Sequence, residues 1–202
     1  MEGQSSTPLS NQGIHQARQL SAALISKPTS KRPSAIYSSP VLRAVQTADI
    51  LTASFGQNSY QLSGDLQEIH QGIFQGLTWS EAQAQHPQLC HQLLSTRQWQ
   101  PVPQAESLMT ARSRAEAWVD QVLHQHQPGE IIWAISHAGI MQQIVSVILG
   151  CDRTWQIPIH HTARFEFWLS QTCWQTLGTD RFNPEYWILR RFNDYSHLTQ
   201  PL

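Results

Sequence analysis

The segment Ile131-Ile132-Trp133-Ala134-Ile135-Ser136-His137-Ala138-Gly139 decides the fold, because an apolar run passes into a polar junction and then into a helix. The run from Glu130 to Ser136 predicts a strand covered on both faces, and the helical spacing from Ala138 ends at Gly150. Ligands of α/β proteins bind at this kind of edge, where a helix N-terminus favours anions. His137 is therefore a candidate functional residue, although a histidine that only packs at the turn fits the same pattern.

A second strand and helix precede this unit. Ala35 to Ser38 predicts a short buried strand, and Val41 to Leu51 has helical spacing. Arg43 lies in the first turn of that helix, where the helix dipole disfavours a cation unless an anion offsets it. Arg43 is therefore a candidate for binding phosphate or carboxylate, with a solvated surface arginine as the alternative.

Repeated strand and helix units predict the fold class. We expect a three-layer α/β/α domain with a mostly parallel central sheet and helices on both faces. Pro87 is expected to stop a helix capped by Thr78, and residues 87–104 are expected to be irregular. The last third is expected to be more antiparallel, with strands over Arg164 to Leu169, Thr172 to Leu177 and Tyr186 to Phe192.

A third segment, Asp65 to Gly76, places an acid in a loop with spaced glycines. Glu68 follows Leu66-Gln67, and Gly72 and Gly76 follow it. On its own, Glu68 is equally well explained as an ordinary loop acid.

Taken in order, these segments resemble the histidine phosphatase superfamily, which is also called phosphoglycerate mutase-like, from about Gly3 to the C-terminus. The resemblance implies that Arg43, in Tyr37-Ser38-Ser39-Pro40 and the helix after it, binds phosphoryl oxygens. It implies that Glu68 donates a proton to the leaving group. It also implies that His137, in Ser136-His137-Ala138-Gly139, holds the transferring phosphoryl group.

Less specific positions agree with this resemblance. Gly3-Gln4 resembles the segment before the family's first helix, so Gly3, Gln4 and Ala138 are predicted as further substrate-binding residues. Glu106-Ser107 with Arg112 resembles the family's Gly-Glu-Ser element, with Ala105 in place of the glycine. Asn193-Asp194 and His197-Leu198 resemble a common C-terminal ending.

One departure concerns the nucleophile. The family's nucleophilic histidine lies in an Arg-His-Gly motif at the end of the first strand, and none of the ten histidines matches it. His15, for example, lies inside the first predicted helix. We therefore expect residues 1–202 to form a single histidine phosphatase-like domain that is incomplete at its N-terminus and lacks its first strand.

Two explanations of this departure compete: a start downstream of the true one, or a shortened protein that binds phosphate without forming a phosphohistidine. Loss of an internal strand leaves backbone groups unpaired, at a cost comparable with the stability of a domain, about 5–15 kcal/mol. The first explanation is favoured.

The expected activity is that of a phosphatase that hydrolyses phosphomonoesters through a phosphohistidine, with a small phosphorylated substrate and no cofactor or metal. The alternatives are an inactive phosphate-binding protein and a mutase-type phosphotransferase. Family mutases bring more basic residues into the region of residues 87–104, where this chain has only Arg97. The phosphatase is therefore preferred.

Composition excludes several other classes. Thirteen Lys and Arg against 14 Asp and Glu give a formal net charge of −1, which offers no general electrostatic attraction for nucleic acid or an anionic membrane. No apolar run approaches the roughly 20 residues that span a bilayer. Three cysteines without a C-x-x-C pair suggest a reducing, cytoplasmic location. The sequence leaves the oligomeric state open.

A metal site is a minor alternative. His160 and His161, with Cys90 or His91, are residue types that bind zinc. Adjacent residues of a strand point to opposite faces, so one of the two histidines serves a shared site more easily than both.

Overall fold

The computed structural model describes residues 1–26, 32–56, 59–96, 100–151, 159–174 and 187–198. In chain order its elements are α1 (Asn11–Ile25), β1 (Ala35–Ser38), α2 (Leu42–Phe55), β2 (Gln61–Leu62), 3-10 turns at Gly64–Leu66 and Gly72–Phe74, α3 (Trp79–Gln85), α4 (Pro87–Ser95), α5 (Leu108–Gln125), β3 (Ile132–Ile135), α6 (Ala138–Leu149), β4 (Arg164–Leu169), α7 (Gln171–Trp174) and β5 (Trp187–Asp194).

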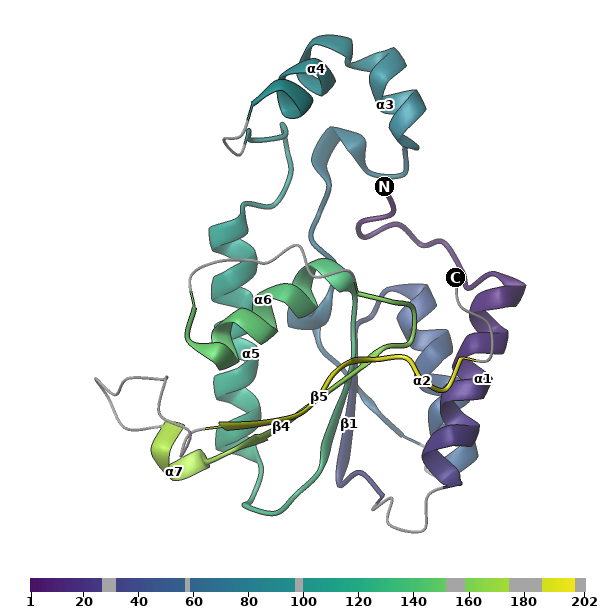
Figure 1. Cartoon of the computed structure of the whole chain (residues 1–202), viewed down its shortest axis with the longest axis vertical. Helices are drawn as coiled ribbons and strands as arrows, with labels where there is room; N and C mark the ends of the chain where they lie inside the picture. The colour runs from purple at the N-terminus through teal and green to yellow at the C-terminus, as the bar shows by residue number, and fades with distance from the viewer. Residues whose placement is uncertain (27–31, 57–58, 97–99, 152–158, 175–186, 199–202) are drawn as a thin grey trace.

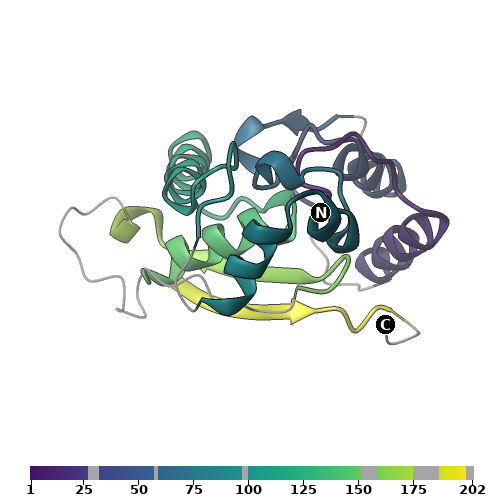
Figure 2. The ribbon, with the colours of Figure 1, turned by 90° about the horizontal axis from the view of Figure 1, so that it is seen from above.

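A parallel sheet of order β2-β1-β3 lies at the centre, with Ser38 opposite Ile135. Helices α1 and α2 lie at one side of the molecule and α5 at the other (Figures 1 and 2). Tyr37 packs with α5 and α6 in the main core, and Trp133 packs edge-on against Phe55 of α2. The expected α/β class, with a parallel central sheet between helices, is confirmed.

The strands β4 and β5 form a separate antiparallel pair in the described part of the chain. This confirms the antiparallel C-terminal third and two of its three predicted strands. The prediction of a strand over Thr172 to Leu177 is wrong as far as the described residues reach, because Gln171–Trp174 is a helical turn. Trp174 is buried there and donates its indole N–H to Asp120 of α5 at 2.9 Å.

Residues 87–104 also differ from the expectation. Thr78 and Glu81 form the capping box of α3, which ends before Pro87 as predicted. Pro87 then begins α4 instead of an irregular segment, since the first turn of a helix needs no N–H from this position. α3 and α4 lie together at one end of the molecule (Figure 1). Ala82 of α3 and Cys90 of α4 form a small apolar cluster with Phe74.

The loop after Glu68 packs backbone against backbone on the segment before α5. Gly72 has φ +57°, and a Cβ there would lie 2.1 Å from the Pro103 carbonyl oxygen. Gln71 and Ala105 form a β-bridge beside this contact. The close approach therefore requires glycine at position 72 for both conformation and space.

We predict that Gly72→Ala destabilises the protein more than Gly56→Ala. Both glycines have positive φ, but a Cβ at Gly56 meets nothing within 4 Å. The left-handed conformation costs a non-glycine residue about 1–2 kcal/mol, and overpacking at Gly72 adds about 1–3 kcal/mol. Urea unfolding of both variants measures the difference, and equal losses would contradict the backbone clash.

Candidate active site

The ends of β1 and β3 bring His137 and Ser39 together. The two strands are parallel neighbours, so the residues after Ser38 and Ile135 meet at one edge of the sheet. The Ser39 N–H donates to the Ile135 carbonyl at 2.9 Å, and the Ser39 hydroxyl lies 2.8 Å from His137 Nε2. His137 is the residue immediately before α6, and both side chains are buried.

His137 is held in its neutral form. Burial, together with the smaller effects of the positive charges of Arg43 and Arg114, lowers its pKa from 6.5 to about 3. The influence of these two charges on the pKa of His137 also indicates that Arg43 and Arg114 lie near its imidazole. His137 therefore presents a neutral imidazole at neutral pH.

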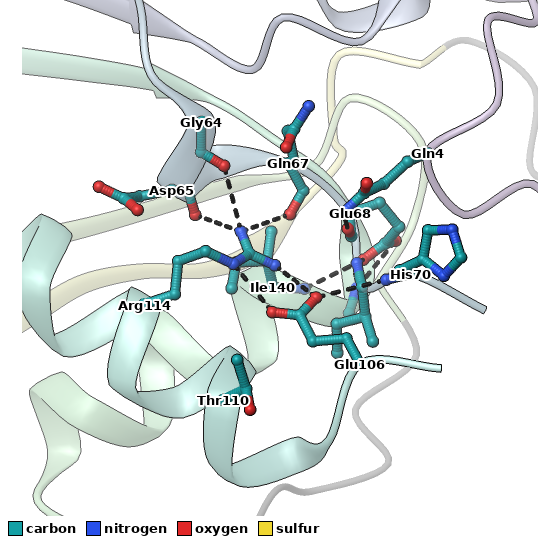
Figure 3. Close-up of polar contacts among 12 residues, drawn as sticks. Gln4, Gly64, Asp65, Gln67, Glu68, His70, Glu106, Thr110, Arg114 and Ile140 are labelled. Carbon is teal, nitrogen blue, oxygen red and sulfur yellow. Dashed lines mark hydrogen bonds and ion pairs between the residues drawn. The ribbon is translucent and has the colours of Figure 1, made fainter. Parts of the chain in front are cut away.

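Glu68 occupies the N-terminus of α6. Its carboxylate accepts the N–H groups of Gly139 at 3.1 Å, Ile140 at 3.2 Å and Ile69 at 2.8 Å (Figure 3). Three backbone N–H groups therefore fix the position of the Glu68 carboxylate. The sequence predicted an external anion at these N–H groups, and the structure places the carboxylate of Glu68 there.

The approach of Glu68 depends on Gly139. A Cβ at position 139 would lie 2.5 Å from Glu68 Oε1. The absence of a Cβ at Gly139 therefore makes room for the Glu68 carboxylate.

Arg43 is the second residue of α2 and is half-buried. Its guanidinium donates to the carbonyl oxygens of Gly3 at 2.7 Å and Ser5 at 3.3 Å. Burial lowers the pKa of Arg43, while the charges of Glu68 and Glu2 act in the opposite direction. Arg43 thus lies within electrostatic range of both Glu68 and His137.

The remaining predicted site residues border this group. Gln4 donates its side-chain amide to the Glu68 carbonyl at 2.9 Å and its N–H to the Gln75 side chain at 3.1 Å. Gly3 is buried with φ +49°. Ala138 is exposed as the first residue of α6.

Arg114 lies beside the site and was not predicted. It forms a two-pronged ion pair with Glu106, with Nε 3.0 Å from Oε1 and Nη2 2.8 Å from Oε2. Arg112, which the sequence analysis associated with Glu106, pairs with Glu116 instead. Arg114 lies seven residues after the N-cap Ser107, so the two residues lie on the same face of α5. This spacing is the sequence signal that points to Arg114.

The residues of the metal alternative lie in different surroundings. Cys90 of α4 is buried in the apolar cluster with Phe74 and Ala82. The His160 ring stacks against Tyr195, with ring centres 3.8 Å apart. Among the residues that the structure describes, no group of three or more His, Cys, Asp or Glu side chains could hold a metal ion. In the same part of the chain, no helix has the length and apolar character to cross a membrane.

The fold and this cluster define an α/β protein with a cationic and imidazole-lined site at the carboxyl edge of its sheet. The family model described as histidine phosphatase superfamily (branch 1) matches residues 1–194. The chain therefore belongs to the histidine phosphatase superfamily.

Relatives and solved structures agree. The chain is 28% identical to phosphoglycerate mutase-like protein 4 of Arabidopsis thaliana, covering 99% of this chain and 80% of the relative. It is also 28% identical to a metal-independent phosphoserine phosphatase of the same plant, covering 98% and 76%. A mycobacterial glucosyl-3-phosphoglycerate phosphatase in complex with inorganic phosphate superposes with a TM-score of 0.75 at 21% identity, over 98% of this chain and 93% of that one. The alpha-ribazole phosphatase of Shigella flexneri has a TM-score of 0.77 at 18% identity, over 96% and 88%.

We predict that His137 makes stability depend on pH. Its folded pKa of about 3 lies below its ordinary value of 6.5, so the unfolded chain binds more protons between these values. The contribution is complete above pH 6.5 and is lost as the pH falls toward 3. Between pH 7 and pH 4.5, His137→Gln should lose about 2 kcal/mol less unfolding free energy than the parent.

Urea unfolding at the two pH values measures this difference. His15→Gln, at an exposed position of α1, is the matched control and should behave as the parent. If His137→Gln also tracked the parent, His137 would not be the group that titrates.

Proposed function

We propose that this chain binds a small phosphorylated substrate through Arg43 and His137, and that it supplies the acid Glu68 for hydrolysis of a phosphomonoester. The observation that carries the proposal is geometric. Glu68 accepts the N–H of Gly139, two residues after His137, and Arg43 and Glu68 contact the adjacent residues Gly3 and Gln4. Family membership and the phosphatase names of its relatives support it.

Arg43 and His137 have the properties that phosphate binding needs. The guanidinium of Arg43 has neutral carbonyl partners at Gly3 and Ser5, and a phosphate would give it charged, two-pronged hydrogen bonds. A neutral His137 has one ring N–H donor, and when it takes up a proton both ring nitrogens become donors, one of which can reach a phosphoryl oxygen. Gly3, Gln4 and Ala138 border these groups, and we propose them as further substrate contacts.

The proposed hydrolysis has two steps. A histidine nitrogen attacks phosphorus and the bond to the leaving oxygen breaks, while Glu68 gives that oxygen a proton. Water then attacks the phosphohistidine, its proton passes to Glu68, and the P–N bond breaks to release phosphate and the histidine. Arg43 and His137 stabilise the phosphoryl oxygens in both transition states.

Two forms of the proposal differ in the nucleophile. In the first, an Arg-His-Gly segment joined upstream of Met1 supplies it. In the second, the chain binds phosphate without turnover, and the absence of an Arg-His-Gly motif among residues 1–202 favours this form for the chain by itself. A mutase activity is a third candidate. The comparison with the basic residues of family mutases depends on Arg97, which lies outside the described residues. The cytoplasmic location stays a prediction.

The first experiment measures phosphate release from p-nitrophenyl phosphate without added metal. It compares residues 1–202 with a chain extended upstream to include Arg-His-Gly. We expect turnover in the extended chain alone, and a loss of about 10²–10⁴-fold in kcat with Glu68→Gln. Unchanged turnover in Glu68→Gln would contradict its acid role, and turnover by residues 1–202 would contradict the assigned nucleophile.

The second measurement is binding of inorganic phosphate by calorimetry. Arg43→Gln should weaken binding roughly tenfold or more, since a hydrogen bond to a charged group is lost. Arg18→Gln removes an equal charge from an exposed position of α1 and is the matched control. Equal affinities in the two variants would contradict phosphate binding at Arg43.

A further inference from the structure

The segment that carries Glu68 is attached to α5 by one arginine. Arg114 Nη1 donates to the carbonyl oxygens of Asp65 at 2.6 Å and Gln67 at 2.8 Å, with Gly64 at 3.4 Å (Figure 3). These carbonyls belong to the 3-10 turn and to the residue just before Glu68. The side chain of Arg114 on α5 therefore fixes the backbone immediately before Glu68.

Glu106 attaches the other side of the same segment. Its carboxylate accepts the His70 N–H at 3.3 Å, and its own N–H donates to the His70 carbonyl at 3.0 Å. Because Arg114 also holds the Glu106 carboxylate on two prongs, the two residues form one clamp. The side chains of the clamp are only 16% and 11% exposed, so water does not substitute easily for these bonds.

Glu68 lies between the two attachments, two residues before His70 and one after Gln67. Its carboxylate is placed on Gly139 and Ile140, and a Cβ at position 139 would lie 2.5 Å from it. A carboxylate with so little clearance moves when its backbone moves. We propose that Arg114 is a positioning residue that acts with Glu106 to hold Glu68 at the N-terminus of α6.

The contacts require an arginine and not simply a positive charge. The guanidinium uses its Nε–Nη2 edge for Glu106 and its remaining nitrogen for the loop carbonyls. A lysine ammonium is a compact point charge on a flexible stem and cannot present two separated edges. The inference rests on the proposed function only in giving Glu68 the role of acid, because the placement itself is observable without turnover.

The first test measures backbone amide exchange at Gly139 and Ile140 by NMR in residues 1–202. The first N–H groups of a helix have no intrahelical acceptor, so Glu68 is their protecting group. Arg114→Gln and Arg114→Lys should each accelerate exchange at both amides roughly tenfold, as Glu68→Ala does. Adding Arg114→Gln to Glu68→Ala should have no further effect at these amides.

The control is Arg112→Gln, which removes the same charge from α5 two residues away and should leave both amides within about twofold of the parent. Unchanged exchange in folded Arg114→Gln, or full recovery in Arg114→Lys, would overturn the proposal. If Arg114→Gln does not fold, Glu106→Gln takes its place, and unchanged exchange there has the same consequence.

The second test uses the extended chain with p-nitrophenyl phosphate. Arg114→Gln should lower kcat toward the value of Glu68→Gln, while KM stays within about twofold because Arg43 and His137 still bind the phosphate. A rise in KM with unchanged kcat would overturn the positioning role. If the extended parent shows no turnover, the proposed function fails, and the exchange experiment still decides whether Arg114 positions Glu68.

Discussion

The contact between the Glu68 carboxylate and the first N–H groups of α6 joins two distant parts of the chain. It links the segment after β2 to the junction of β3 and α6, and Gln4 attaches the N-terminal residues to the same segment. A helix N-terminus has unpaired N–H groups and a positive dipole end, so a carboxylate is a favourable partner. Because Glu68 takes the Gly139 and Ile140 N–H groups, the proposed function assigns phosphate binding to Arg43, His137 and the exposed Ala138.

Much of the fold could be predicted because its signals are local. The apolar run before His137 and the glycine at position 150 gave α6 its observed bounds, Ala138–Leu149. The exceptions depended on tertiary contacts. Trp174, for example, is drawn into the core and onto Asp120, and a helical turn provides that contact where an extended pattern was expected. Pro87 was a boundary as predicted, but the same residue is compatible with a helix start.

The candidate site likewise contains residues that could be recognised from local sequence and one residue that could not. Arg43, Glu68 and His137 lie next to strand and loop signals, so their sequence segments could be recognised. Arg114 could not be found in that manner, because its partners at residues 64–67 are carbonyl oxygens that every residue has. Two positions along a helix differ by about 200°, which separates the ion pair of Arg112 from that of Arg114 on α5.

The electrostatics of the site connect ligand binding to proton uptake. Without a ligand, Arg43 is positive, Glu68 is held by N–H donors, and the buried His137 is neutral because its pKa is about 3. Under the proposed function, a phosphate bound by Arg43 and His137 brings negative charge to the imidazole. This charge opposes the effects of burial and of the nearby arginines on the pKa of His137. Phosphate binding therefore raises the pKa of His137 and favours the imidazolium. Since linked equilibria are reciprocal, protonation of His137 strengthens phosphate binding by the same factor. The proposed function thus couples proton uptake by His137 to phosphate binding, because the negative phosphate offsets the charge of the buried imidazolium.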